Sequence, residues 1–148
     1  MKKPNIYVRL VGKPDHISAE AERVIRKLHV QTFGPETKFY IEGSYWWIAY
    51  CDGLPIGFTG LKPFTAVGRA FLYRSGVLTA FQGNGLQKRF IRIRERLAKK
   101  IGLMRMVTYT SEDNLPSANS LISCGYKLYK PKTPWGIAHA LYFAKDFD

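Results

Sequence analysis

The stretch that decides the fold is Val77-Leu78-Thr79-Ala80-Phe81-Gln82-Gly83-Asn84-Gly85-Leu86-Gln87. Apolar residues typical of a strand end lead through two glycines into a helical pattern that continues to Ile101. A turn of this kind leaves backbone N–H groups unpaired at a helix N-terminus, where they bind phosphate. Gly83 and Gly85 would let a ligand approach the backbone closely. The stretch therefore predicts an anion-binding loop, with an ordinary strand-to-helix turn as the alternative.

The residues around this loop exclude two common phosphate motifs. No Gly-Lys-Ser/Thr follows the glycines, so the loop is not that of a nucleoside triphosphatase. A third glycine is missing, and so is the acidic residue expected after the following strand, so the dinucleotide-binding fingerprint fails as well.

The segments on either side of the loop alternate between strand and helix patterns. We expect strands at residues 6–11, 45–51, 54–63, 70–78, 105–110, 126–130 and 137–145, and helices at 18–33, 86–101 and 117–124. Ser18 is expected to cap the first helix, and Asp52-Gly53 to form a hairpin turn. This order predicts an α/β (α+β) fold in a single domain over residues 1–148, with an antiparallel meander feeding a parallel crossover.

The long helix after the loop is predicted to be amphipathic. At 100° per residue, one face carries Leu86, Phe90, Ile93, Leu97 and Ile101. The opposite face carries Lys88, Arg89, Arg92, Arg96, Lys99 and Lys100. That basic face indicates either a solvated surface or contact with a phosphate, a nucleic acid or an acidic substrate.

Composition narrows the class of partner. The 148 residues carry a net charge of +12, which favours an anionic ligand, nucleic acid or membrane surface. Two cysteines and three histidines show no metal-ligand spacing, so we expect no metal; His29 is expected on the buried face of the first helix. No segment has the length of an apolar membrane span, and polar residues interrupt the N-terminus. We therefore expect a cytoplasmic protein with no membrane partner.

A second motif, Asn114-Leu115-Pro116-Ser117-Ala118-Asn119-Ser120-Leu121-Ile122-Ser123-Cys124-Gly125-Tyr126, follows the loop. Together the two stretches resemble the GCN5-related N-acetyltransferase (GNAT) superfamily. The superfamily loop pattern, Gln/Arg-x-x-Gly-x-Gly/Ala, is met at Gln82 and Gly85. The later pattern, from an Asn through a short helix to Gly-Phe/Tyr, is met at Asn114 and Gly125-Tyr126.

This resemblance implies a fold and a reaction. The implied GNAT fold has a central mixed, mostly antiparallel sheet of six to seven strands with helices on both faces. Strands 4 and 5, expected at residues 70–78 and 105–110, would splay apart. The implied reaction uses acetyl-CoA, itself a polyanion, and proceeds by direct attack of an amine on the thioester. The stretch from Gly76 to Tyr129 is similar to a subgroup common in bacteria and their phages.

The resemblance also implies the site. CoA would contact the strand end, the loop, the first helical turn and the second motif, at Val77, Leu78, Thr79, Gln82, Gly83, Asn84, Gly85, Leu86, Gln87, Lys88, Asn114, Ser117 and Asn119. Two catalytic groups frequent in the family are absent, because Leu121 stands at the position of the Tyr and Arg69 at that of a carboxylate. Proton transfer would then fall to water and to Tyr73 or Ser75, which alternate with Val77 on one strand face.

The acceptor is left open. Trp135 precedes the last expected strand, in a loop that often shapes the acceptor site of the resembled family, so it is the candidate substrate contact. A small metabolite, a protein amine and an aminoacyl group on RNA all fit an N-acetyltransferase. The charge suggests a nucleic-acid-modifying or nucleic-acid-binding protein on the same fold as one alternative. The missing catalytic groups suggest a non-catalytic acyl-CoA-binding module as another. Family members are often dimers, so a homodimer stays open.

Overall fold

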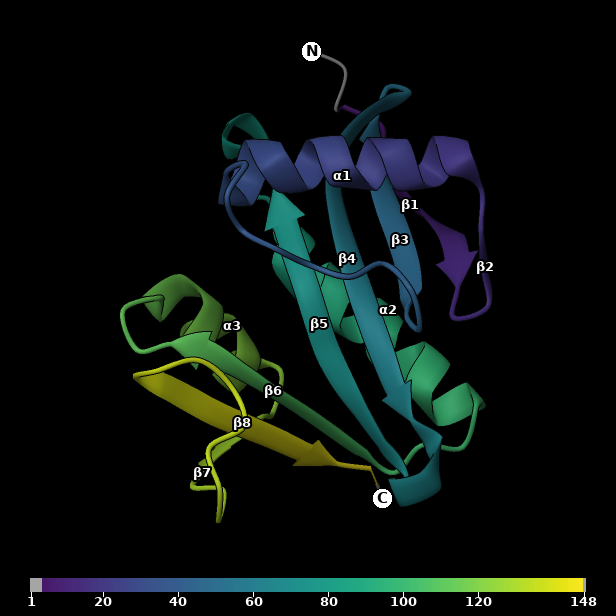
Figure 1. Cartoon of the computed structure of the whole chain (residues 1–148). Helices are drawn as coiled ribbons and strands as arrows, with labels where there is room; N and C mark the ends of the chain where they lie inside the picture. Colours follow the sequence, from purple (N-terminus) through teal and green to yellow (C-terminus); the bar gives the residue numbers. More distant parts are fainter. Residues whose placement is uncertain (1–3, 148) are drawn as a thin grey trace. The chain divides into compact units, whose positions relative to one another are not determined.

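The computed structural model describes residues 4–147 (Figure 1). The strands are β1 (Ile6–Lys13), β2 (His16–Ile17), β3 (Tyr45–Cys51), β4 (Leu54–Phe64), β5 (Arg69–Val77), β6 (Arg105–Ser111), β7 (Lys127–Tyr129) and β8 (Ala140–Asp146). The α-helices are α1 (Ala19–Phe33), α2 (Leu86–Lys100) and α3 (Leu115–Ser123). The chain divides into unit 1, formed by Met1–Lys62 and Tyr73–Leu86, and unit 2, formed by Pro63–Leu72 and Gln87–Asp148.

The strands form an eight-stranded sheet in the order β2-β1-β3-β4-β5-β6-β8-β7. Of the described ladders, β5 with β6 is parallel and the others are antiparallel. The predicted α/β class and mixed, mostly antiparallel sheet are thus confirmed. The sheet has one strand more than the upper expectation because a turn at Pro14-Asp15 folds β2 back onto the last residues of β1.

In unit 1, α1 lies across β3 and β4 (Figure 1). Its core joins Ile25 and Leu28 of α1 to strand residues Trp46, Ile48 and Phe58. The helix begins where predicted, because the Ser18 hydroxyl accepts the Ala21 N–H at 3.1 Å. The predicted hairpin between β3 and β4 is also present. Its Asp52 and Gly53 have φ of 49° and 86°, as a type I′ turn requires.

His29 lies in this core, as its helical spacing predicted. It is 2% exposed, its ring centroid is 3.8 Å from that of Phe39, and its buried Nε2 has no hydrogen-bond partner among residues 4–147. Burial, followed by the positive charges of Arg74 and Arg26, lowers the pKa of His29 to about 4. The imidazole is therefore neutral in the folded protein at every pH above that value.

This burial predicts a loss of stability in mild acid. Unfolded histidine has a pKa of about 6.5, so below that pH the unfolded state binds a proton that native His29 does not accept. The free energy of unfolding should fall between pH about 6.5 and about 4, by up to about 3 kcal/mol from this group. Urea unfolding across this range should show a smaller pH dependence in His29→Phe. Equal pH dependence in both proteins would mean that His29 is protonated in the native state.

In unit 2, β6 and β8 form a long antiparallel ladder from Arg105↔Asp146 to Ser111↔Ala140. The parallel register of β5 with β6 covers Arg69–Phe71 opposite Arg105–Val107, and the Thr108 hydroxyl then donates to the Leu72 carbonyl at 3.0 Å. Directly after the residues paired in this register, a β5 backbone carbonyl thus accepts a hydrogen bond from a β6 side chain.

The two helices of unit 2 differ in detail from the sequence prediction. Helix α3 begins at Leu115, two residues early, because Asn114 is its N-cap. The buried residues of α2 beyond its first are Phe90, Ile91, Arg94, Glu95 and Ala98. Of the face predicted to be buried, Ile101 is 36% exposed. The buried face is rotated because it accommodates two charged side chains that have partners.

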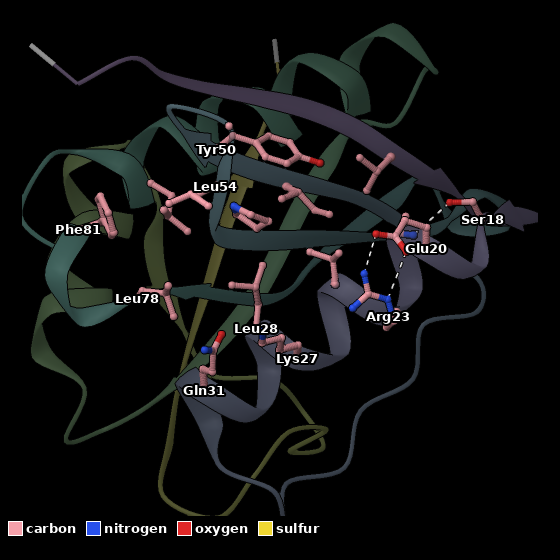
Figure 2. A pocket seen from close by; sticks show the side chains of 17 residues that line it. Ser18, Glu20, Arg23, Lys27, Leu28, Gln31, Tyr50, Leu54, Leu78 and Phe81 are labelled. Atoms are coloured by element: carbon pink, nitrogen blue, oxygen red, sulfur yellow. Dashed lines mark hydrogen bonds and ion pairs between the residues drawn. The ribbon is translucent and has the colours of Figure 1, made fainter.

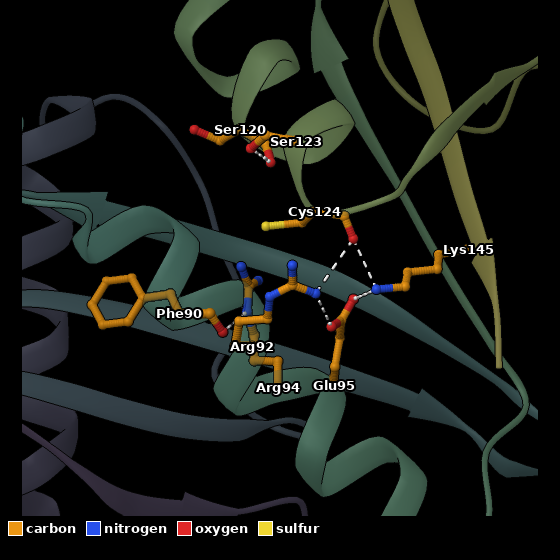
Figure 3. Close-up of polar contacts among 8 residues, drawn as sticks. All are labelled: Phe90, Arg92, Arg94, Glu95, Ser120, Ser123, Cys124 and Lys145. Atoms are coloured by element: carbon orange, nitrogen blue, oxygen red, sulfur yellow. Dashed lines mark hydrogen bonds and ion pairs between the residues drawn. The ribbon is translucent and has the colours of Figure 1, made fainter.

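Those partners form a polar network (Figure 3). The carboxylate of Glu95, whose side chain is 5% exposed, lies 3.2 Å from Arg92 and 3.1 Å from Lys145. Both cations also donate to the Cys124 carbonyl at the end of α3. Arg94 donates through Nε to the carbonyl one turn earlier, and burial lowers its pKa to about 10, so it stays charged at neutral pH. The network ties the middle of α2 to α3 and β8.

Candidate functional site

The predicted loop connects β5 to α2 through a short 3-10 turn, Thr79–Phe81, and an open segment at residues 82–85. Two side-chain amides of this segment donate hydrogen bonds to backbone carbonyls a few residues earlier. Gln82 donates to the Val77 carbonyl and Asn84 to the Phe81 carbonyl, each at 3.0 Å. The side chains of both residues therefore shape the loop, which leaves its backbone as the surface offered to a ligand.

The backbone of the loop provides unpaired donors. Gly83 and Gly85 have φ of 83° and 72°, and in the described part of the chain a Cβ at either position would meet nothing within 4 Å. Backbone conformation rather than space therefore requires glycine here. Within residues 4–147, the N–H groups of Gly83, Asn84 and Gly85 donate to no protein acceptor. Three donors thus precede the first turn of α2, a ready anion site.

Four more predicted residues of unit 1 lie on β5 or directly after it. Val77 is buried, and the next residue, Leu78, donates its N–H to the Ile56 carbonyl at 2.9 Å. The Tyr73 hydroxyl accepts the Tyr40 N–H at 3.0 Å. Ser75 is half-buried. Unit 1 therefore brings the predicted strand end and the predicted loop into one continuous segment.

In unit 2 the predicted CoA contacts lie on α2, on α3 and at the N-cap of α3. Gln87 and Lys88 are exposed in the first turn of α2. Asn114 accepts the Ser117 N–H through its Oδ1 at 3.3 Å, so the structure brings these two residues together. Because that oxygen caps α3, the Nδ2 of Asn114 is the part available as a donor. Asn119 is exposed on α3.

Leu121 and Arg69 occupy the two positions where the resembled family often has a catalytic Tyr and a carboxylate, and neither side chain can replace those groups. Leu121 is buried within α3, and Arg69 is exposed at the start of β5. A cation and an apolar side chain do not accept a proton from an amine at neutral pH. These positions therefore give no general base or acid.

Sequence reasoning missed the segment Lys38–Tyr40, which two β5 side chains hold. Arg74 donates to the Lys38 carbonyl at 3.0 Å, beside the bond from Tyr40 to Tyr73. These contacts join residues 36 and 33 positions apart in sequence, and the segment has no regular secondary structure. No local pattern in the sequence signals them.

A cavity of about 860 Å³ lies on the α1 side of unit 1 (Figure 2). Side chains of α1 and of the β3–β4 hairpin line it, and Glu20 and Arg23 form an ion pair at its wall. Of the predicted site residues, Leu78 reaches it. Gly83, Asn84 and Gly85, which carry the unpaired donors, do not line this cavity.

Two further observations bear on the partner. Across residues 4–147, no helix combines the length and apolar character that crossing a membrane would need. The same part of the chain contains no group of three or more His, Cys, Asp and Glu side chains that would hold a metal ion.

Residues 17–126 match the model of the acetyltransferase (GNAT) family. No curated protein matches the sequence. Among solved structures, an IAA acetyltransferase from Bacillus cereus superposes with a TM-score of 0.76 at 14% identity, covering 97% of this chain and 100% of that chain.

Two other solved structures contain a cofactor. The PaiA N-acetyltransferase of Thermoplasma acidophilum, in complex with coenzyme A, has a TM-score of 0.75 at 16% identity, with 97% and 99% of the two chains covered. A GNAT family acetyltransferase of Elizabethkingia anophelis with acetyl-CoA bound has a TM-score of 0.72 at 13% identity, with 98% and 100% covered. At sequence identities this low, the structural similarity shows that the fold is shared.

Proposed function

Because the chain belongs to the acetyltransferase (GNAT) family, we propose that it transfers the acetyl group of acetyl-CoA to a primary amine. The observation that carries the proposal is the row of unpaired N–H donors at Gly83, Asn84 and Gly85, directly before α2. The CoA pyrophosphate is the anion that these donors and the helix dipole would bind. The CoA and acetyl-CoA complexes among the structural neighbours support this choice of anion.

In this proposal, the rest of the acetyl-CoA molecule contacts the other predicted CoA-binding residues. Leu78, Thr79, Gln82, Leu86, Gln87 and Lys88 flank the pyrophosphate, with Lys88 supplying a positive charge. The Nδ2 of Asn114 donates to a pantetheine carbonyl, because its Oδ1 already caps α3. Ser117 and Asn119 contact CoA from the first turns of α3. The side chains of Gln82 and Asn84 support the loop from within.

The reaction needs little side-chain chemistry. The neutral amine attacks the thioester carbonyl carbon, and the backbone N–H of Val77 stabilises the negative oxygen of the tetrahedral intermediate. The C–S bond then breaks, CoA leaves as a thiolate that takes a proton, and the amine nitrogen loses one. Tyr73 and Ser75 are the candidate relays through water. Because the Tyr73 hydroxyl accepts the Tyr40 N–H, its own proton is directed toward another acceptor.

A panel of primary amines tests this proposal. With acetyl-CoA present, free CoA thiol should appear faster with at least one amine than without any, and mass spectrometry should find that amine heavier by one acetyl group. Tyr73→Phe should lower kcat for that amine if Tyr73 relays the proton. If acetyl-CoA binds but no amine causes release of the CoA thiol, the protein is a non-catalytic acyl-CoA-binding module rather than an enzyme.

A further inference from the structure

One sheet face of unit 2 carries a cluster of five aromatic rings, here called the aromatic cluster: Phe71, Tyr109, Tyr129, Trp135 and Tyr142. The Trp135 ring stands nearly perpendicular to Phe71 and Tyr109, with centroids 5.4 and 5.3 Å away. Trp135 is nevertheless 42% exposed. The cluster therefore presents a large aromatic ring to solvent on a support of other rings.

The loop that contains Trp135 is held in place by hydrogen bonds to two tyrosines of the aromatic cluster. The Trp135 indole N–H donates to the Tyr129 hydroxyl at 3.2 Å, and the Gly136 N–H donates to the Tyr142 hydroxyl at 2.9 Å. A Cβ on Gly136 would approach the Tyr109 ring to 2.7 Å, so the backbone passes directly over that ring. An aromatic side chain held in this way loses little conformational freedom when a ligand stacks on it.

The charge beside the aromatic cluster is positive. Lys130 and Lys132 are exposed and precede Trp135 in the same loop. Within residues 4–147, neither lysine pairs with a carboxylate. Asp146 pairs with Arg105 at 2.8 Å, and Glu112 lies 3.8 Å from His139. A ligand that stacks on the rings and carries negative charge therefore fits this surface.

A nucleotide combines these two properties, because its base stacks on aromatic rings and its phosphate pairs with lysine. We propose that the aromatic cluster stacks the base of a nucleotide-bearing acceptor, whose phosphate Lys130 and Lys132 bind. This names the acceptor class of the reaction proposed above and rests on that proposal. A free nucleotide derivative and the end of a nucleic-acid strand share this chemistry.

Tryptophan fluorescence tests the binding, because Trp46 and Trp47 are 0% and 5% exposed and Trp135 is the accessible indole. CoA is left out, because its own adenine nucleotide would compete for the aromatic cluster; the Trp135 variants show whether a signal comes from the cluster or from the cofactor site. Guanosine 5′-monophosphate should then quench the fluorescence saturably, and ribose 5-phosphate should not. Trp135→Ala should weaken binding of the nucleotide, followed by calorimetry, about fivefold to a hundredfold. Trp135→Phe should abolish the quenching but retain most of the affinity.

Matched variants separate the site from general effects. Lys130→Gln/Lys132→Gln should weaken nucleotide binding about tenfold, whereas Lys99→Gln/Lys100→Gln, with the same charge change on α2, should not. Leu128→Ala, at the neighbouring strand position to Tyr129, should leave binding unchanged. Tighter binding of a single-stranded pentanucleotide than of the mononucleotide would assign a nucleic-acid end; equal affinity would assign a free nucleotide.

The failure of this inference and that of the proposed function are distinguishable. A protein that acetyl-CoA stabilises but that binds no nucleotide overturns the inference alone. Equal affinity for ribose 5-phosphate and the nucleotide, or unchanged affinity in Trp135→Ala, also overturns it. Nucleotide binding at the aromatic cluster without any effect of acetyl-CoA overturns the proposed function and leaves a nucleotide-binding surface.

Discussion

Replacing Gly85 by glutamate is expected to abolish acetyl-CoA binding. Gly85 has a φ of 72°, which side-chain-bearing residues adopt at a cost of about 1–2 kcal/mol. The new carboxylate would also stand beside the proposed pyrophosphate site and repel it. Affinity should fall at least about a hundredfold, which corresponds to about 2.7 kcal/mol. The measurement is the rise in melting temperature that acetyl-CoA produces in each protein.

Gly102→Glu is the matched control. Gly102 follows α2 with a φ of 86°, and no described residue lies within 4 Å of a Cβ placed there. The same charge and similar backbone strain are thus introduced away from the loop. This variant should melt earlier than the wild type and still respond fully to acetyl-CoA. If Gly85→Glu folds and responds as the wild type does, the cofactor is not bound where we propose.

Glu95→Ala is expected to cause the largest loss of stability. The substitution removes a 5% exposed carboxylate and leaves Lys145, whose side chain is 21% exposed, without its anion. Breaking a buried ion pair from one side costs about 3–5 kcal/mol, and the partial exposure of Lys145 and Arg92 favours the lower end of that range. Urea unfolding should show a loss of about 3 kcal/mol, and melting should occur about 10 °C earlier.

Glu20→Ala tests whether burial, rather than a short distance between the charges, makes an ion pair stabilise the fold. Glu20 lies 2.6 Å from Arg23, closer than Glu95 lies to either cation, but both side chains are mostly exposed. Exposed pairs contribute little, because water and salt screen the charges. This variant should unfold at the same urea concentration as the wild type. Equal losses in Glu20→Ala and Glu95→Ala would show that the network of Glu95 does not stabilise the fold.

Local patterns predicted the elements well. Ser18 caps α1 and Asp52-Gly53 forms the hairpin turn, because each depends on backbone groups within a few residues. The same logic located the loop and the glycines that need positive φ. Asn114 was correctly placed after the fifth expected strand, but its role as the N-cap of α3 was missed because α3 was expected to begin later.

Contacts between distant residues were not predictable in this way. Glu95 was not assigned to the buried face of α2, since its partner Lys145 lies on β8. Its spacing from Ile91 and Ala98, one turn away on either side, was the signal that would have placed it on the buried face. The support of Trp135 likewise depends on residues of β5, β6 and β8. Only their assembly in the fold shows that the rings meet.

The central claim is that the segment from Gln82 to Leu86 binds the pyrophosphate of acetyl-CoA. The most direct test is the melting temperature of the wild-type protein with and without about 1 mM acetyl-CoA. For a Kd of about 10 µM, this concentration adds about 2.7 kcal/mol to the stability of the folded state. Melting should then rise by about 5–10 °C. An unchanged melting temperature would contradict the account.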